Sequence, residues 1–118
     1  MIFFRSIRHA LRGVRYTFEH ERNFKIHLVI AFIVVALAIV LQVSPIQWLF
    51  IITAIASVLA LEIVNTVFEK VVDMFQPRVH EYAAIIKDLM AAAVLIASLS
   101  ALIVGSLIFL PLLFTRLL

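Results

Sequence analysis

The sequence predicts an all-α integral membrane protein in which an N-terminal amphipathic surface helix precedes three transmembrane helices. The first indication is composition, because 65% of the 118 residues are hydrophobic, 14% are charged and the mean hydropathy is +1.18. A soluble domain is about 45–50% apolar and about 25% charged, and a small domain cannot hide such an excess from water. Three long apolar stretches and a one-sided distribution of cations give the other indications. We expect a single unit over residues 1–118.

Residue types that are rare or missing exclude several classes of protein. The chain has no cysteine, which excludes a disulfide scaffold, a cysteine zinc site and a thiol nucleophile. Its two glycines, Gly13 and Gly105, are too few for the phosphate loop of a P-loop or Rossmann fold. The apolar composition also excludes intrinsic disorder. No nucleic acid partner is expected.

Residues 1–25 are expected to form the amphipathic surface helix and the junction that follows it. Apolar side chains recur there at spacings of three and four, at Phe3, Ile7, Leu11, Val14 and Phe18. The opposite stripe is basic and consists of Arg5, Arg8, Arg12 and Arg15. A basic amphipathic helix lies in the membrane interface among anionic headgroups. This composition favours a simple anchor and leaves a substrate-binding role open.

The expected transmembrane helices are residues 26–43, 46–68 and 89–113. A helix needs about 20 predominantly apolar residues to cross a bilayer. The second span reaches that length only by continuing past Glu62 towards Phe68, which places a carboxylate near the membrane boundary. Between the first two spans, Ser44 and Pro45 predict a helix stop and restart, because proline suits the first turn of a helix.

The cations lie almost entirely on one side of these spans. Of the ten Lys and Arg residues, all except Arg116 precede the first span or connect the second and third. The positive-inside rule makes that side, and with it the N-terminus, cytoplasmic. The seven Asp and Glu residues lie on or near the same side. Any chemistry is therefore expected at the cytoplasmic interface.

Four polar residues repeat along the second span at steps of three, four and four. They are Glu62, Asn65, Glu69 and Asp73. This spacing puts all four on one helix face, and acids at the membrane are rare and usually functional because they are costly. Three acids on one stripe repel one another and need cations, for which a divalent ion is the most economical choice. The alternative is a set of salt bridges between helices, to Arg15, Arg22, Lys25 or Lys87.

Two further polar groups lie at the same membrane depth. Glu19, Glu21, Arg22, Asn23 and Lys25 precede the first span, and Lys87 and Asp88 precede the third. Carboxylates from two sources suit Mg²⁺, which binds through one or two carboxylates plus phosphate oxygens. A lysine adds a point charge for phosphate. These parts would serve phosphoryl transfer, where catalysis is positioning and charge neutralisation.

Two weaker patterns remain. His20 and His27 are seven residues apart and could share a helix face. Without a third ligand nearby, we interpret them as interfacial or hydrogen-bonding residues rather than a zinc site.

In the third span, small residues recur every four positions, at Ala93, Ala97, Ala101 and Gly105. Such a ridge permits close helix contact, either between subunits or within the chain.

Three strings together resemble the prokaryotic diacylglycerol kinase and undecaprenol kinase family. They are ERNFKIH at 21–27, EIVNTVFEKVVD at 62–73, and the pair Lys87-Asp88, accompanied by Pro77 and His80. The resemblance covers roughly residues 5–105 in the same order and spacing, and the E-x-x-N-T-x-x-E-x-x-x-D string is its most specific part. The first string favours the Gram-positive-type undecaprenol kinase branch.

The resemblance implies a homotrimer in the bacterial inner membrane, with the active site facing the cytoplasm. Each subunit would have a surface helix and three transmembrane helices. The implied reaction is Mg²⁺-dependent transfer of the γ-phosphoryl group of ATP to the hydroxyl of a membrane lipid. Undecaprenol and diacylglycerol both remain open as the acceptor, because both present a primary hydroxyl at the interface.

The resemblance also implies residue roles. Glu62 matches the catalytic base, Asn65 an active-site amide that binds substrate, and Glu21 and Glu69 the acids that bind the metal. The positions that match nucleotide-binding or site-ordering residues are Arg15, Glu21, Glu69, Asp73, His80, Lys87 and Asp88, and Gly13 matches a surface-helix position near the nucleotide. Departures from the family pattern are Ile86, Met90 and Ala92, which change bulk around Lys87 without removing a chemical group.

The spacing along the second span agrees with these roles. Glu62 is the deepest acid of the stripe and so lies nearest to a lipid hydroxyl. Asn65, one turn away, is expected to donate a hydrogen bond to the Glu62 carboxylate. The lipid pocket is expected to open sideways to the bilayer, with Glu62 and Asn65 at its polar end.

Two functions of other classes are also considered. A small non-enzymatic membrane protein, such as a transporter or an assembly subunit, would place its acid in mid-membrane rather than at a cytoplasmic edge with further acids and a lysine. A lipid phosphatase would need a histidine nucleophile or an arginine-rich phosphate cage, and the second span has neither nearby.

Overall fold

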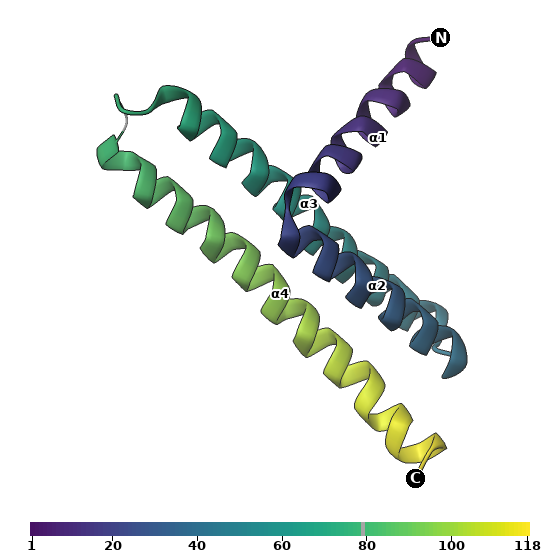
Figure 1. The fold of residues 1–118 in the computed structure, drawn as a ribbon. Coiled ribbons are helices and arrows are strands. Elements are labelled where there is room, and N and C mark those ends of the chain that lie inside the picture. The colour runs from purple at the N-terminus through teal and green to yellow at the C-terminus, as the bar shows by residue number, and fades with distance from the viewer. Residues whose placement is uncertain (79) are drawn as a thin grey trace.

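The computed structural model describes residues 1–78 and 80–118. It consists of four helices, which are α1 (Ile2–His20), α2 (Arg22–Val40), α3 (Pro45–Phe75) and α4 (His80–Arg116). Helices α2, α3 and α4 are each long and apolar enough to cross a membrane. Figure 1 shows α1 projecting away from these three helices. The predicted all-α membrane fold, with one surface helix and three spans, is confirmed.

A single residue separates the surface helix from the first span. Glu21 has an extended backbone, with φ −113° and ψ 112°, and its N–H donates to the carbonyl of Thr17 as α1 ends. The chain then turns directly into α2, which begins four residues before the expected span. Because of this break, His20 ends α1 while His27 lies on α2. The idea that these two histidines share one helix face is therefore wrong.

The link between α2 and α3 has the predicted stop and restart. The Ser44 hydroxyl accepts from the Gln47 N–H at 3.2 Å, and the Gln47 side chain accepts from the Ser44 N–H at 2.9 Å. This reciprocal capping box satisfies two N–H groups that a helix start leaves without partners. Pro45 occupies the first position of α3, where its fixed φ suits a helix.

Helices α3 and α4 extend well beyond the apolar stretches. Helix α3 has 31 residues and runs on to Phe75, while α4 has 37 residues and starts at His80. At 1.5 Å per residue, α3 is about 46 Å long, which exceeds the roughly 30 Å hydrocarbon core. Hydropathy marks only the part inside the membrane, and the helix continues outside because Glu and Lys are good helix formers. The charged link between these spans is thus mostly helix.

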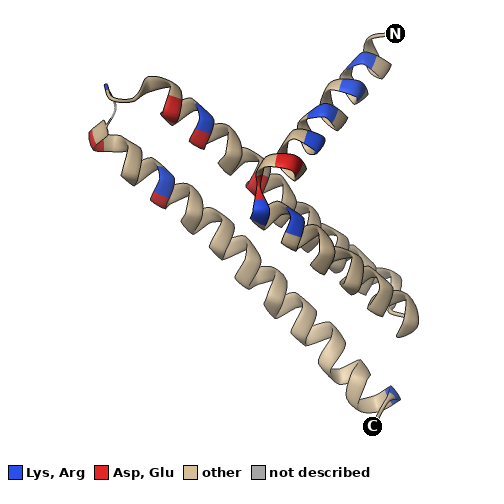
Figure 2. Cartoon of the chain, in the orientation of Figure 1, with Lys and Arg blue, Asp and Glu red and all other residues tan. Residues whose placement is uncertain are grey.

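A small hydrophobic core lies at the end of the bundle opposite the charges. It consists of Ala38, Leu41, Val43, Ile51, Ile108 and Phe109. The side chain of Arg116 donates to the carbonyl of Leu41, which ties the end of α4 to the link after α2. Figure 2 shows that the other Lys and Arg residues, with all the acids, lie on α1, around the start of α2, on the far halves of α3 and α4 and in the link between those two helices. The two ends of the bundle therefore differ strongly in polarity.

One chain alone is not compact. Its accessible surface is 8981 Å², whereas a compact soluble monomer of this mass would expose about 6500 Å². The radius of gyration is 17.5 Å, compared with about 13.5 Å for a globular domain of this length. Much of the apolar surface of α2, α3 and α4 is exposed, so it must meet lipid or other protein.

Candidate active site

A polar cavity of about 340 Å³ lies where the start of α2 faces α3 and α4. Its polar lining includes Glu21, Asn23, Glu62, Asn65, Glu69 and Lys87. Five of these six are predicted site residues, and they come from three separate parts of the sequence. The helical spacing of α3 supplies Glu62, Asn65 and Glu69 on one face, and the break before α2 brings Glu21 to the same cavity.

Glu62 is the most enclosed of these acids. Its side chain is 6% exposed, and one of its oxygens is hydrogen-bonded to Nδ1 of His27 on α2. Thr66, also buried, donates to the Glu62 backbone carbonyl at 3.0 Å, which keeps its own hydroxyl satisfied within the helix. An apolar interior admits a carboxylate only with such a partner.

Asn65 has a different partner from the one expected. Its amide donates to the Glu69 carboxylate at 3.3 Å, not to Glu62. Glu69 lies one turn further along α3 towards Phe75, so the i to i+4 spacing favours this bond. Asn65 therefore orders the outer acid of the cavity, and the inner acid is held from another helix.

Lys87 connects α4 to α3. Its ammonium group lies 3.1 Å from an Asp73 carboxylate oxygen, and their side chains are 42% and 55% exposed. An ion pair this exposed contributes little stability. This pair agrees with the salt-bridge alternative for the outermost acid of the stripe, while Lys87 also lines the cavity.

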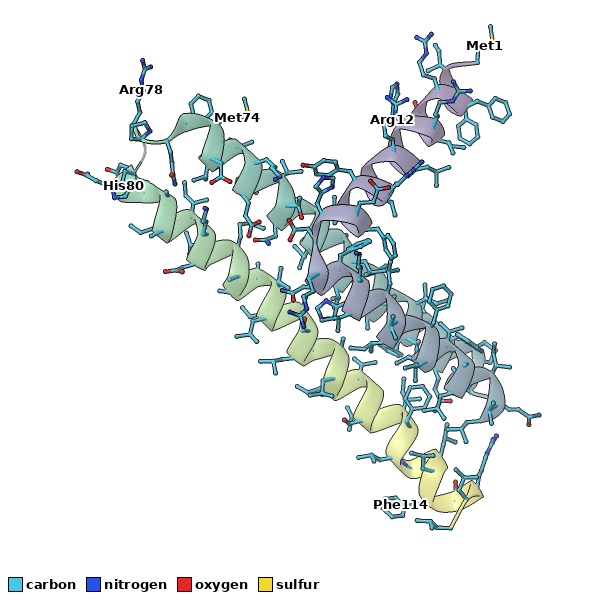
Figure 3. All side chains as sticks on the ribbon, in the orientation of Figure 1. Met1, Arg12, Met74, Arg78, His80 and Phe114 are labelled. Atoms are coloured by element: carbon cyan, nitrogen blue, oxygen red, sulfur yellow. The ribbon has the colours of Figure 1, made fainter. Side chains whose placement is uncertain are left out.

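Besides Asp73, which is paired with Lys87, three predicted residues lie away from the cavity. Arg15 on α1 is bonded to Glu19 at 2.8 Å, and its guanidinium lowers the pKa of the Glu19 carboxyl through this hydrogen bond. His80 lies at the outer end of the α3–α4 pair, close to Arg78 (Figure 3). Asp88 is exposed on α4. None of the three lines the cavity within this chain.

The charges in the cavity favour a bound cation. Glu21, Glu62 and Glu69 carry up to three negative charges, and Lys87 supplies one positive charge that it shares with Asp73. Among the described residues, no cluster of three or more His, Asp or Glu side chains forms a complete metal site. Two carboxylates are nevertheless enough for Mg²⁺ when phosphate oxygens and water complete the octahedron. The residues thus fit a metal that enters with a polyphosphate.

A second, apolar groove of about 520 Å³ adjoins the polar cavity. It runs between α2, α3 and α4 and is lined mainly by aliphatic side chains, with Phe109 towards the far end. Ser98 lines both spaces, and His27, which lines the groove, is bonded to Glu62, which lines the cavity. An apolar channel between spanning helices therefore leads to the buried carboxylate.

The ridge of small residues contributes to this groove. Ala101 and Gly105 line it, and Ala93 and Ala97 are half-buried. A Cβ added to Gly105 would meet nothing nearer than the Phe109 ring at 4.0 Å. Within the described residues, no atom of another helix lies within 4 Å of that position, so Gly105 leaves space in the groove instead of making a tight intramolecular contact there.

The sequence assigned no site role to four residues of the site. Asn23, Thr66 and Ser98 line the cavity; Asn23 was named only as part of the polar group before the first span, and a single hydroxyl within an apolar helix has no pattern that marks it. His27 was expected to form a hydrogen bond, which is confirmed, but its partner Glu62 is 35 residues away. The sequence did contain a signal for this bond: His27 is a polar residue inside an apolar stretch, and the helix it faces carries the buried acid Glu62.

Known proteins match this chain along nearly its full length. The family model described as prokaryotic diacylglycerol kinase matches residues 8–109. The chain belongs to the prokaryotic diacylglycerol kinase family. The undecaprenol kinase of Bacillus subtilis (strain 168) is 38% identical over 109 residues, which cover 92% of this chain and 89% of that protein.

Diacylglycerol kinases match as well. That of Synechocystis is 39% identical over 107 residues, covering 90% of this chain and 61% of that protein. That of Escherichia coli (strain K12) is 33% identical over 95 residues, covering 80% of this chain and 78% of that protein. The expected family is confirmed, and the long match to an undecaprenol kinase supports that branch. The chain is a membrane lipid kinase, so the transporter and phosphatase alternatives are set aside.

Proposed function

We propose that this lipid kinase transfers the γ-phosphoryl group of ATP to the hydroxyl of undecaprenol or diacylglycerol, with Mg²⁺ as cofactor. The reaction takes place at the cytoplasmic face of the bacterial inner membrane. The observation that supports this most strongly is the junction of two spaces. A cavity with three carboxylates, amides and a lysine meets an apolar groove at Ser98, which lines both, and at the hydrogen bond between His27 and Glu62.

The acceptor lipid enters from the side. Its chain lies in the apolar groove, and its hydroxyl reaches Glu62 at the end of the groove. Glu62 is about 10 Å from Glu69 along α3, at 1.5 Å per residue. This spacing separates the roles of the two acids: the hydroxyl is held at the inner acid and the polyphosphate at the outer one.

The proton and the phosphoryl group then move as follows. The Glu62 carboxylate accepts the proton of the lipid hydroxyl, and the lipid oxygen forms a bond to the γ-phosphorus. The bond between the γ-phosphorus and the oxygen that bridges it to the β-phosphate breaks, and ADP leaves with that oxygen. Lys87 neutralises phosphate charge, and Asn65 keeps the Glu69 carboxylate in place.

Glu21 and Glu69 are the residues that would hold Mg²⁺. The ion would supply positive charge that neutralises the phosphate oxygens during transfer. Asp73 orders Lys87 by its ion pair. Arg15, His80 and Asp88 lie outside the cavity of one chain, so their proposed contacts with nucleotide require closure of the site or a neighbouring subunit.

A homotrimer would supply those neighbours. Its support is the large exposed surface and the distance of predicted nucleotide-binding residues from the cavity. Mixing two inactive variants tests this arrangement. If Glu62→Gln and Asp88→Asn subunits regain activity when they assemble together, the sites are shared between subunits. A mixture as inactive as either variant alone would contradict shared sites.

The experiment that tests the proposed reaction is a transfer assay. Purified protein in micelles is given radioactive γ-labelled ATP and Mg²⁺, with undecaprenol or diacylglycerol offered in turn. We expect label in at least one lipid, and the ratio of kcat/KM values identifies the preferred acceptor. No label in either lipid would contradict the proposed acceptors.

A further inference from the structure

The His27–Glu62 pair joins two helices at the junction of the two spaces. His27 lies in the second turn of α2, and its Nδ1 atom is hydrogen-bonded to a Glu62 carboxylate oxygen on α3. The side chains are 26% and 6% exposed, respectively. The histidine ring lines the apolar groove, and Glu62 lines the polar cavity.

This bond is the sole side-chain hydrogen bond of Glu62 within the described part of the chain. Asn65, the other candidate to hold Glu62, is bonded to Glu69. A glutamate has several rotatable bonds, and a base that samples several rotamers loses the alignment that proton transfer needs. The imidazole therefore fixes one carboxylate oxygen and leaves the other for a further partner.

We propose that His27 is a positioning residue that aims Glu62 at the acceptor hydroxyl. With Nδ1 protonated, the ring donates to Glu62, as histidine does when it is oriented by a carboxylate. The lipid approaches along the groove that His27 lines, so its hydroxyl arrives beside the oxygen that His27 leaves free. This inference rests on the proposed function, in which Glu62 accepts the hydroxyl proton.

Isosteric variants separate positioning from general packing. The side-chain amide of asparagine places an N–H close to the Nδ1 position of histidine, whereas glutamine places it closer to Nε2. We therefore compare His27→Asn, His27→Gln and His27→Ala at saturating lipid and Mg-ATP. His20→Ala serves as control, because within the described residues His20 bonds the Tyr16 carbonyl on α1 alone and stacks on the Tyr16 ring.

The expected effect is on kcat. Loss of a residue that orients a functional group typically costs about 10- to 100-fold, so His27→Ala and His27→Gln should lower kcat by that factor. His27→Asn should recover kcat to within about threefold of the native value, and the KM for Mg-ATP should stay unchanged in all three variants. His20→Ala should leave kcat unchanged. An asparagine variant as slow as the alanine variant would overturn the proposal.

A double-variant cycle distinguishes this role from a structural one. If His27 acts through Glu62, adding His27→Ala to Glu62→Gln should change kcat by less than about twofold. A further loss as large as in the native background would also overturn the proposal. If the native enzyme is active and the His27 variants are unaffected, only the positioning role of His27 is contradicted. If the native enzyme itself is inactive, the proposed function is contradicted.

Discussion

The three acids on one face of α3 differ in what surrounds them. Glu62 is buried and bonded to His27, Glu69 accepts from Asn65, and Asp73 is exposed and paired with Lys87. An even spacing along a helix thus gives three environments, because the neighbouring helices cover only the inner part of the stripe. This gradient is the physical basis for assigning proton transfer to the inner acid and phosphate chemistry to the outer ones.

The metal-binding role of Glu69 gives a direct prediction. Glu69→Gln removes a charge from the cavity without changing the size of the side chain, and Asn65 can still bond to its carbonyl oxygen. We expect the Mg²⁺ concentration for half-maximal activity to rise by at least about tenfold. Titration of Mg²⁺ at fixed ATP measures this.

Two comparisons make the metal prediction specific. Glu19→Gln, the same change on the exposed surface of α1, should leave the Mg²⁺ requirement unaltered. If Glu21 and Glu69 bind one ion, their combined variant should deviate from additivity, as expected for residues in one network. Full activity of Glu69→Gln at limiting Mg²⁺ contradicts the assignment.

The start of α3 is fixed by hydrogen bonds that a hydropathy profile does not show. The restart of α3 depends on the capping box of Ser44 and Gln47 and on Pro45. Ser44→Ala removes the acceptor for the Gln47 N–H and should reduce the free energy of unfolding by about 1 kcal/mol. Reversible denaturation in micelles, followed by circular dichroism, measures the change.

Ser57→Ala is the matched control for the cap. Ser57 lies within α3 and donates to the Thr53 carbonyl at 2.7 Å. Its loss should be neutral, because the carbonyl already serves the helix and serine bonds of this kind stabilise little. Equal destabilisation by both substitutions would contradict a specific role of the cap.

The four helices and the five predicted residues that line the cavity could be predicted from the sequence. Periodicity located the surface helix and the stripe, and Ser44-Pro45 located the link. The stripe already implied helix as far as Asp73, close to the observed end of α3 at Phe75, but the start of α4 at His80 was missed because a helix outside the membrane needs no apolar residues.

The partner of Asn65 was missed because helical spacing brings both Glu62 and Glu69 within its reach, and packing selects between them. The partner of Glu62 was missed because His27 lies on another helix, and contacts between helices depend on packing.

In the whole molecule, the candidate active site lies at one end of the bundle and the hydrophobic core at the other. The hydrophobic core and the contact of Arg116 with Leu41 hold the far end, while the apolar groove leads towards the charged end. The helices thus stay joined at the far end, and the acceptor can enter from the bilayer without unfolding the bundle.

Filling the groove should hinder the lipid selectively. Ala101 lines the groove, whereas its neighbour Ser100 is exposed and does not. Ala101→Phe should raise the KM for the lipid by about tenfold, equivalent to about 1.4 kcal/mol, and leave the KM for Mg-ATP unchanged. Ser100→Phe at the same depth should change neither constant. Equal effects of both variants on lipid KM would show that the groove is not the acceptor channel.

The central claim is that Glu62 accepts the proton of the lipid hydroxyl, and Glu62→Gln tests it most directly. Glutamine keeps the size of the side chain and can still accept from His27, but it cannot act as the base. With lipid and Mg-ATP saturating, turnover should fall by about 10²–10⁴-fold, the usual contribution of general base catalysis, while nucleotide affinity changes little. A Glu62→Gln enzyme with near-native turnover would contradict the account and leave Glu62 as a buried structural partner of His27.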